Sequence, residues 1–104
     1  MVKKVDRQGF EEALRTPGKP VVVDFAAEDC VYCKKLAPIL AEVAEEHAGE
    51  IEVFYVDTDE QEELAERYDI MTVPSVFVFV NGEVARSAVN PRGKKALLDL
   101  IFAD

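Results

Sequence analysis

Strand-like and helix-like patterns alternate along this chain of 104 residues. Strands are predicted where apolar, β-branched and aromatic residues concentrate, at residues 2–5, 21–26, 51–56, 76–80 and 83–89. The run 21–26 is too uniformly apolar for a half-exposed strand, so it predicts a central strand that is covered on both faces. The dipeptide Asn81-Gly82 favours a two-residue hairpin turn between the last two strands.

Apolar residues recur at helical spacing in the segments between these strands. The predicted helices follow Asp6 through Leu14 and occupy residues 33–47, 60–68 and 91–102. Asp6 is suited to cap the first helix, and Pro91 is suited to open the last one. Pro38 lies inside the second helix, where it removes a backbone hydrogen bond and predicts a kink.

The predicted order of elements is β-α-β-α-β-α-β-β-α. Alternating units at the start favour parallel pairing, whereas the final hairpin must be antiparallel. We therefore predict an α/β fold in which a mixed central sheet of about five strands is flanked by about four helices. No repeat, linker or low-complexity segment interrupts the chain, so residues 1–104 are predicted to form one domain.

The chain is acidic, with a formal net charge of −9 at pH 7. This charge argues against nucleic acids and anionic membrane surfaces as partners, because both attract positively charged proteins. Residues 36–66 hold eleven Asp or Glu and no Lys or Arg. We interpret this stretch as a solvated acidic face, because it lacks the alternating oxygen ligands and turn glycine of a calcium loop.

No part of the sequence indicates a membrane segment or a targeting signal. No run approaches the roughly 18 apolar residues that a membrane-spanning helix needs. Residues 1–6 lack a hydrophobic signal core, so a cytoplasmic location is the default prediction. An exported mature form is the alternative.

The most informative motif is Cys30-Val31-Tyr32-Cys33, which contains both cysteines of the chain. It lies between the apolar strand at 21–26 and the helix that follows. Free N–H groups and the dipole at a helix N-terminus stabilise a thiolate, and the thiolate is the form that attacks disulfides. We predict that Cys30 is the exposed nucleophile and that Cys33, one turn further into the helix, is the buried resolving thiol.

Two other kinds of site use cysteines at this spacing, a structural disulfide and half of a zinc site. A zinc site needs two or more further ligands. The chain has no other cysteine, and His47 is its only histidine. We therefore predict no metal and no cofactor besides a redox-active Cys30–Cys33 pair.

Asp24 interrupts the apolar strand six residues before Cys30. Burying a carboxylate is costly unless the group is neutral or hydrogen-bonded. We predict that Asp24 is a buried acid with a raised pKa that accepts the proton of Cys33. The alternative is that its side chain reaches the surface.

The segment Thr72-Val73-Pro74-Ser75 precedes the fourth strand. A proline inside a strand loses a hydrogen bond of the sheet, so Pro74 should start the strand or hold a turn. Because most peptide bonds before proline are trans, the sequence alone favours a trans proline at this position.

Together these residues resemble the thioredoxin family over essentially the whole chain. The resemblance is carried by the order and spacing of short matching pieces, namely Val22-Val23-Asp24-Phe25, Cys30-Val31-Tyr32-Cys33-Lys34, Ala37-Pro38-Ile39-Leu40, Val56-Asp57, Thr72-Val73-Pro74-Ser75 and Asn81-Gly82-Glu83. It implies a thioredoxin fold in which Pro74 is cis and packs beside the disulfide.

The resemblance also implies a function and a set of site residues. Cys30, Cys33 and Asp24 take the positions of nucleophile, resolving thiol and buried acid. A substrate chain would contact Val31 and Tyr32, and would pair with the backbone of Val73 beside Pro74 in a β-like mode. The implied partners are proteins that contain disulfides and a reductase that donates electrons. A monomer is the family's usual state.

Several positions depart from the pattern of that family. The aromatic residues that commonly flank the motif are replaced by Ala26 and Asp29, and the usual Gly-Pro between the cysteines is Val31-Tyr32. A lysine that often accompanies the buried acid corresponds to about Tyr55, and a late glycine of the docking surface corresponds to Asn90. The surface that meets an ordinary thioredoxin reductase is therefore altered.

Asp29 bears on the direction of the redox reaction. Its charge beside Cys30 opposes formation of the thiolate, by an amount that exposure and salt limit to about one pKa unit or less. Oxidants with this chemistry owe their strength to a stabilised thiolate. We therefore predict a reductant, and the leading function is a protein disulfide reductase.

Three alternatives remain open at this stage. Tyr32 and the Thr72-Val73-Pro74 turn also resemble glutaredoxins, although Glu28 and Asp29 put negative charge where the carboxylates of glutathione would bind. The motif also resembles redox partners that are dedicated to one exported pathway. The third alternative is a non-enzymatic module that binds a partner through its acidic face.

Overall fold

The strands and helices follow the predicted order in a computed structural model, which describes residues 2–103. The strands are β1 (Lys3–Lys4), β2 (Val21–Ala26), β3 (Glu52–Asp57), β4 (Ser75–Val80) and β5 (Glu83–Val89). The helices are α1 (Arg7–Leu14), α2 (Val31–Glu46), α3 (Glu62–Arg67) and α4 (Lys94–Ile101). No helix within the described residues is long and apolar enough to cross a membrane.

The strands form one mixed sheet in the order β1-β3-β2-β4-β5. The central strand, β2, runs parallel to β3 and antiparallel to β4. All six residues of β2 are buried, which confirms the prediction that this strand is covered on both faces. The register places Asp24 opposite Tyr55 of β3 and Val76 of β4.

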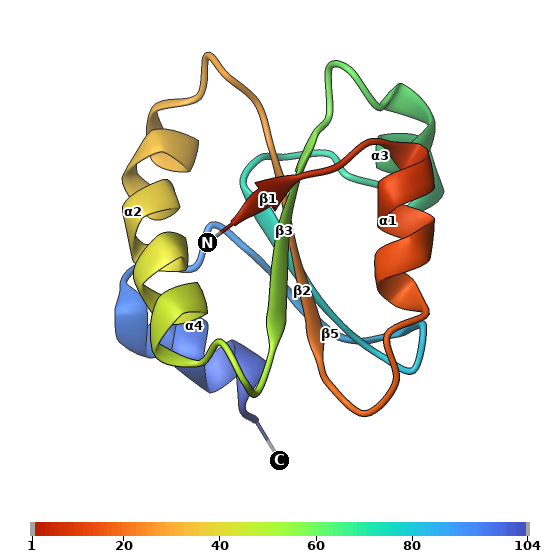
Figure 1. Ribbon diagram of the computed structural model, residues 1–104. Helices are drawn as coiled ribbons and strands as arrows, with labels where there is room; N and C mark the ends of the chain where they lie inside the picture. Colours follow the sequence, from red (N-terminus) through yellow and green to blue (C-terminus); the bar gives the residue numbers. More distant parts are fainter. Residues whose placement is uncertain (1, 104) are drawn as a thin grey trace.

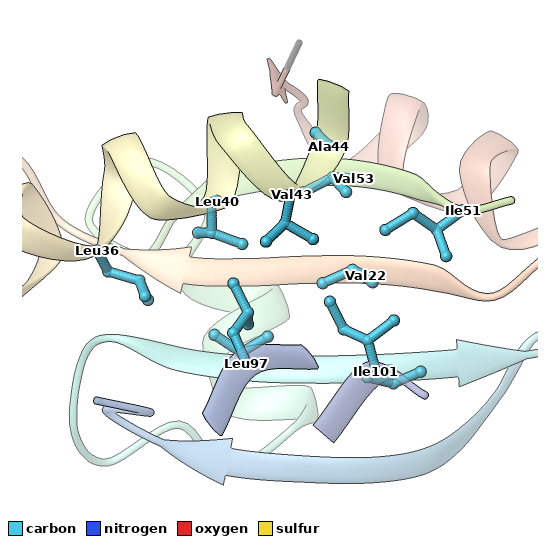
Figure 2. Close-up of a cluster of buried hydrophobic side chains, with 11 residues drawn as sticks. Val22, Leu36, Leu40, Val43, Ala44, Ile51, Val53, Leu97 and Ile101 are labelled. Atoms are coloured by element: carbon cyan, nitrogen blue, oxygen red, sulfur yellow. The ribbon is translucent and has the colours of Figure 1, made fainter. Parts of the chain in front are cut away.

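Two helices cover each face of the sheet, α1 and α3 on one side and α2 and α4 on the other (Figure 1). On the α2 side, aliphatic side chains such as Leu40 and Val43 meet Val22 and Ile101 (Figure 2). On the α1 side, Phe10 is fully buried among aromatic rings. Alternating side chains of β2 thus serve two different cores, so the strand is held rigidly from both sides.

The structure confirms the predicted helix cap at Asp6 and the predicted turn at Asn81-Gly82. The Asp6 carboxylate caps α1 by accepting a hydrogen bond of 2.8 Å from the N–H of Gly9. Asn81 and Gly82 both have positive φ angles, 53° and 83°, as the tight hairpin turn between β4 and β5 requires.

The boundaries of three helices differ from the prediction. Helix α3 begins at Glu62 and not at Glu60, and it ends at Arg67 and not at Tyr68. Helix α2 begins at Val31 and not at Cys33, so Cys30 becomes its cap. Helix α4 begins at Lys94 and not at Pro91. Gly93 has a φ angle of 92°, which lies outside helical geometry, so residues 91–93 form a loop.

The acidic stretch 36–66 is largely the solvated surface that its composition predicts, but Asp57 is an exception. Asp57 is buried, with only 4% of its surface exposed. Its Oδ1 accepts hydrogen bonds from the N–H groups of Asp59 at 2.8 Å and Glu60 at 3.2 Å. The prediction of a solvated side chain is wrong for Asp57, because these local bonds replace its contacts with water.

Candidate redox site

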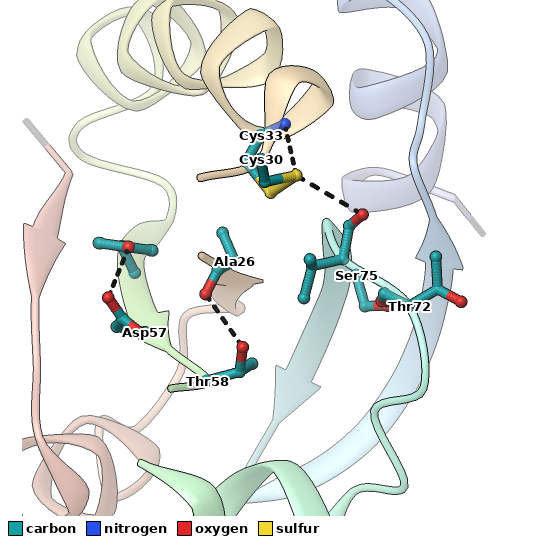
Figure 3. The surroundings of a disulfide bond; sticks show 9 residues. Ala26, Cys30, Cys33, Asp57, Thr58, Thr72 and Ser75 are labelled. Carbon is teal, nitrogen blue, oxygen red and sulfur yellow. Dashed lines mark hydrogen bonds between the residues drawn. A yellow bond between two sulfur atoms is a disulfide. The ribbon is translucent and has the colours of Figure 1, made fainter. Parts of the chain in front are cut away.

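Cys30 and Cys33 form a disulfide at the point where the loop after β2 enters α2. Cys30 is the N-cap of the helix, and its Sγ accepts a hydrogen bond of 3.1 Å from the N–H of Cys33 (Figure 3). Cys33 is only 5% exposed, whereas Cys30 is half-buried. The helix therefore presents one sulfur to the outside and keeps the other beneath it, and its N–H groups are placed to stabilise negative charge on Cys30.

A loop from the other half of the chain lies against the disulfide. The carbonyl oxygen of Val73 is 3.8 Å from Cys30 Sγ. The peptide bond between Val73 and Pro74 is cis, so the trans proline favoured by sequence alone is wrong and the cis form implied by the resemblance is confirmed. Val73 precedes β4 and is not paired in the sheet. Its backbone is therefore a place where another extended chain can pair.

A second loop supports the first. The N–H of Asn90 donates a hydrogen bond of 2.7 Å to the carbonyl of Pro74. Asn90 has a φ angle of 47°, a conformation that glycine tolerates best and that asparagine adopts more readily than other residues. Asn90 thus keeps the positive φ angle of this position, at which the family that the sequence resembles has glycine.

Asp24 lies below the disulfide and is almost completely buried, with 4% of its surface exposed. Its Oδ1 has no hydrogen-bond partner among the described residues. Burial without such partners disfavours the charged form and raises the pKa of Asp24 to about 7. The alternative that this side chain reaches the surface is therefore wrong.

Asp24 and Cys33 line the same cavity of about 400 Å³. Its other walls are mostly apolar and include Ala26 and Leu40. Because Asp24 and Ala26 are two positions apart on β2, their side chains point to the same face of the sheet. The small side chain of Ala26 leaves part of this space open above the acid.

Tyr55 borders the cavity from β3, directly across from Asp24. Its hydroxyl donates a weak hydrogen bond of 3.4 Å to Oδ2 of Asp57. Burial, together with the nearby charge of Asp57 and this hydrogen bond, raises the pKa of Tyr55 to about 12. Tyr55 therefore stays neutral and brings no negative charge to Asp24, and, unlike a lysine, it has no cationic form to stabilise the charged acid.

The outer side of the site is exposed. Val31 and Tyr32 leave 65% and 51% of their surfaces open to solvent. The ring of Tyr32 lies 5.4 Å from the Nζ of Lys35 and 5.9 Å from the guanidinium carbon of Arg92. Sequence reasoning missed both cations. Lys35 could have been found from its spacing of three residues after Tyr32, but Arg92 comes from a distant loop.

The structure thus brings together all of the predicted site residues. Cys30, Cys33, Val73 and Pro74 form the centre, with Asp24 below it and with Val31 and Tyr32 at its surface. His47 lies at the other end of α2, where its ring packs at a tilt against Phe102 and its Nδ1 contacts Glu50. Within residues 2–103, no three His, Cys, Asp or Glu side chains converge in a way that could hold a metal ion.

Comparisons with known proteins agree with this geometry. The family model described as Thioredoxin matches residues 1–103. A thioredoxin of Streptomyces clavuligerus is 38% identical over 98 residues, which cover 94% of this chain and 91% of that protein. A solved structure of Plasmodium falciparum thioredoxin superposes with a TM-score of 0.87 at 31% identity and covers 96% of both chains.

Two further relatives have longer chains. The chloroplastic M-type thioredoxin of Spinacia oleracea is 37% identical over 100 residues. The matched region covers 96% of this chain but only 55% of that protein. A bifunctional thioredoxin reductase/thioredoxin of Mycobacterium leprae is 34% identical over 97 residues, which cover 93% of this chain and 21% of that protein.

Proposed function

Because this chain belongs to the thioredoxin family and is a thiol-disulfide oxidoreductase, we propose that it reduces disulfides of other proteins through the Cys30–Cys33 pair. The observation that carries the proposal is the difference in burial between the two sulfurs. One of them faces the surface at a helix N-terminus, and the other faces a buried acid. A structural disulfide needs neither arrangement.

In the first step the reduced protein acts through the thiolate of Cys30. This thiolate attacks one sulfur of the substrate disulfide, so that a bond forms between Cys30 and that sulfur while the substrate bond breaks. The other substrate sulfur leaves as a thiolate and takes a proton. The backbone of Val73 beside Pro74 and the exposed side chains of Val31 and Tyr32 hold the substrate chain in this step.

In the second step Cys33 resolves the mixed disulfide. Asp24 in its charged form accepts the proton of the Cys33 thiol across the cavity that both residues line. The Cys33 thiolate then attacks Cys30, which forms the Cys30–Cys33 disulfide and releases the second substrate sulfur as a thiolate. Two electrons have passed to the substrate, and the protein is left in the oxidised form that the structure describes.

The oxidised protein needs a reductase that returns two electrons to the pair. The Mycobacterium leprae relative joins a thioredoxin reductase and a thioredoxin in one chain, which supports a thioredoxin reductase as the donor. The proposed reaction uses no metal or organic cofactor within this chain, because the two sulfurs carry both electrons. We place the reaction in the cytoplasm, where a dithiol of this kind is kept reduced.

The reduction potential of the Cys30–Cys33 pair tests the direction of the reaction. Equilibration with a glutathione and dithiothreitol series should give a value near or below about −250 mV, which is typical of thioredoxin-type reductants. A value above about −200 mV would instead place the protein with glutaredoxin-like or oxidising proteins.

A Cys30→Ser variant separates the reductase from a non-enzymatic binding module. The variant should lose the reduction of a disulfide-containing protein completely, because no other thiol reaches the surface. A protein that works only through its acidic face would keep its physiological effect without Cys30.

A further inference from the structure

A small cleft opens beside the redox centre, between the first turns of α2 and the loop at residues 90–93. Its volume is about 250 Å³, and Tyr32, Lys35, Asn90 and Arg92 are among its lining residues. Asn90 is hydrogen-bonded to Pro74, and the carbonyl of Val73 contacts Cys30. The cleft is therefore continuous with the surface on which a substrate chain would lie.

Two cations are held at this cleft by one aromatic ring. Lys35 and Arg92 approach the ring of Tyr32 to within 6 Å of its centroid, the range in which a cation is attracted to an aromatic face. Lys35 comes from α2 and Arg92 from the loop before α4, so Tyr32 joins two separate segments. Because the ring already restricts both side chains, they lose less conformational entropy when they bind an anion.

Within residues 2–103, Lys35 and Arg92 are among the cations that have no carboxylate partner. Acidic residues outnumber Lys and Arg by 21 to 12. Lys4, Lys94 and Lys95 each pair with a carboxylate within 3 Å. Among residues 2–103, neither Lys35 nor Arg92 makes such a pair. Positive charge is therefore left available beside the redox centre of a strongly acidic protein.

The opposite flank of the centre carries mixed charge, because Lys4 and Lys34 line its cavity together with Glu28. Glu28 lines the cavity over Asp24 and does not border the cleft of Tyr32, and Asp29 immediately precedes Cys30. A substrate chain across the disulfide therefore meets both acidic and basic side chains on one flank, and two cations with no carboxylate beside them in the cleft on the other. Such an arrangement favours one charge pattern in the substrate and repels its reverse.

We propose that the cleft formed by Tyr32, Lys35 and Arg92 is a specificity subsite that binds an Asp or Glu side chain of the protein substrate close to its reactive cysteine. The guanidinium of Arg92 suits the two oxygens of a carboxylate, and Lys35 adds a second charge. This inference rests on the proposed reduction of protein disulfides, and it assigns that reaction a preference for acidic sites.

The test uses three peptides, each a dimer joined through one cysteine disulfide. Residues two positions before and after the cysteine are Glu in the first peptide, Gln in the second and Lys in the third. The protein is reduced with a dithiol and separated from it, and the second-order rate of peptide release is measured by chromatography at low salt. The Glu peptide should react about three- to fivefold faster than the Gln peptide, as expected for exposed ion pairs, and the Lys peptide should react more slowly.

Variants assign this preference to the cleft. In Arg92→Gln with Lys35→Gln the ratio of the Glu to the Gln rate should fall to about one, and Arg92→Lys should retain part of it. Arg15→Gln is the matched control, because Arg15 is an exposed cation at the end of α1 that does not line the cleft. It removes one positive charge and should leave the ratio unchanged. High salt should reduce the ratio in the wild-type protein.

Equal rates for the Glu and Gln peptides at low salt would refute the proposed subsite. A ratio of the Glu rate to the Gln rate that stays above one in the double variant would refute it as well. A preference seen only with glutathione disulfide, with no difference among the peptides, would overturn it too. Failure of all three peptides to react would refute the proposed reductase and this inference with it. A normal rate with the Gln peptide and no charge preference would refute the inference alone.

Discussion

The inner and outer sides of the Cys30–Cys33 disulfide surround the same two sulfurs with opposite environments. On the inner side, Asp24 is buried beside a mostly apolar cavity and lacks a partner for one oxygen. On the outer side, Asp29 is exposed to solvent. Both groups are aspartates near the same disulfide, so the difference between them comes from their surroundings.

The surroundings of a carboxylate determine how strongly its charge acts on neighbouring groups. Water screens the field of an exposed carboxylate, which then acts on its neighbours by a few tenths of a kcal/mol to about 1 kcal/mol. A buried carboxylate keeps its field and also loses its hydration, so that its pKa moves by several units. Substitutions on the inner side should therefore change stability and proton transfer, whereas those on the outer side should adjust reactivity slightly.

The largest effect is expected when the inner sulfur is removed. In Cys33→Ser the outer sulfur of Cys30 can still attack a substrate, but nothing resolves the product. Turnover should stop, and a mixed disulfide between Cys30 and the substrate should accumulate, as detected by mass spectrometry of the intact adduct. Cys30→Ser is the control and should form no adduct. An adduct at Cys33 in that control would show that the inner sulfur is accessible from outside.

The next largest effect is expected from Asp24→Asn. The pKa of Asp24 is raised from 3.8 to about 7, so between these values the folded protein holds a proton that the unfolded chain releases. Stability therefore falls as pH rises through this window and stays at the lower value above about pH 7. The Asp24→Asn variant does not lose stability in this pH window, because its amide does not titrate. It should be more stable than wild type at pH 8 by up to about 4 kcal/mol, and about equally stable below about pH 4.

Urea denaturation of the oxidised proteins across this pH range measures the difference. Glu45→Gln is a suitable control, because Glu45 is an exposed carboxylate on the same side of the sheet, in α2. The control should change stability by a few tenths of a kcal/mol at most and without the same pH window. A constant difference between Asp24→Asn and wild type at every pH would argue against a buried acid that titrates.

The same substitution should change the pH profile of catalysis. If charged Asp24 accepts the proton of Cys33, the rate of resolution should rise with pH through about 7 in the wild-type protein. Asp24→Asn should lose this inflection and resolve mixed disulfides about 10²-fold more slowly at pH 8. Rapid quenching of a preformed mixed disulfide measures this step alone. An unchanged inflection in the variant would assign the titration to another group.

A smaller effect is expected from Ala26→Leu, which places a larger apolar side chain in the cavity above Asp24. The added methyl groups bury apolar surface and should stabilise the protein by about 1 kcal/mol. They also exclude water from the acid, so the inflection attributed to Asp24 should move to a higher pH. Stability and the pH profile of resolution are both measured. The double variant Ala26→Leu with Asp24→Asn should keep the gain in stability. Its pH profile of resolution should show no inflection near pH 7, because the titrating acid is absent.

The smallest effect is expected on the outer side, from Asp29→Asn. Removing this exposed charge should make the Cys30 thiolate form more readily, by a fraction of a pKa unit up to about one unit at low salt. Ultraviolet absorbance of the thiolate, followed against pH in the reduced protein, measures the change. The effect should shrink as salt is added, and Glu45→Gln should show none. An unchanged titration of Cys30 in Asp29→Asn would remove the basis for the predicted reducing character.

Much of the fold could be predicted because its signals are local. The uniformly apolar run of β2 required cover on both faces, and Asn81-Gly82 required a tight turn. The spacing of Cys30 and Cys33 before a helix indicated the redox chemistry, and Asp24 stood out because a charged residue interrupted a buried strand. Each of these signals involves residues that are close in sequence, so periodicity and the geometry of turns and caps were sufficient.

Other features depended on contacts between distant segments. Local patterns favoured a trans bond at Pro74, and only the resemblance to a known family implied the cis bond that is present. Local patterns also placed the start of α4 at Pro91 rather than at Lys94. Nor did composition reveal that Asp57 is buried.

The elements, their order and the chemistry of the two sulfurs could be predicted from the amino-acid sequence alone, since these follow from local patterns. The cavity that Asp24 and Cys33 share, and the meeting of Arg92 with Lys35 at the ring of Tyr32, depend instead on how the folded chain packs. The hydration of a charge, and with it the pKa and the binding role of that charge, depends on every group packed around it. Such groups come together only when the chain has folded.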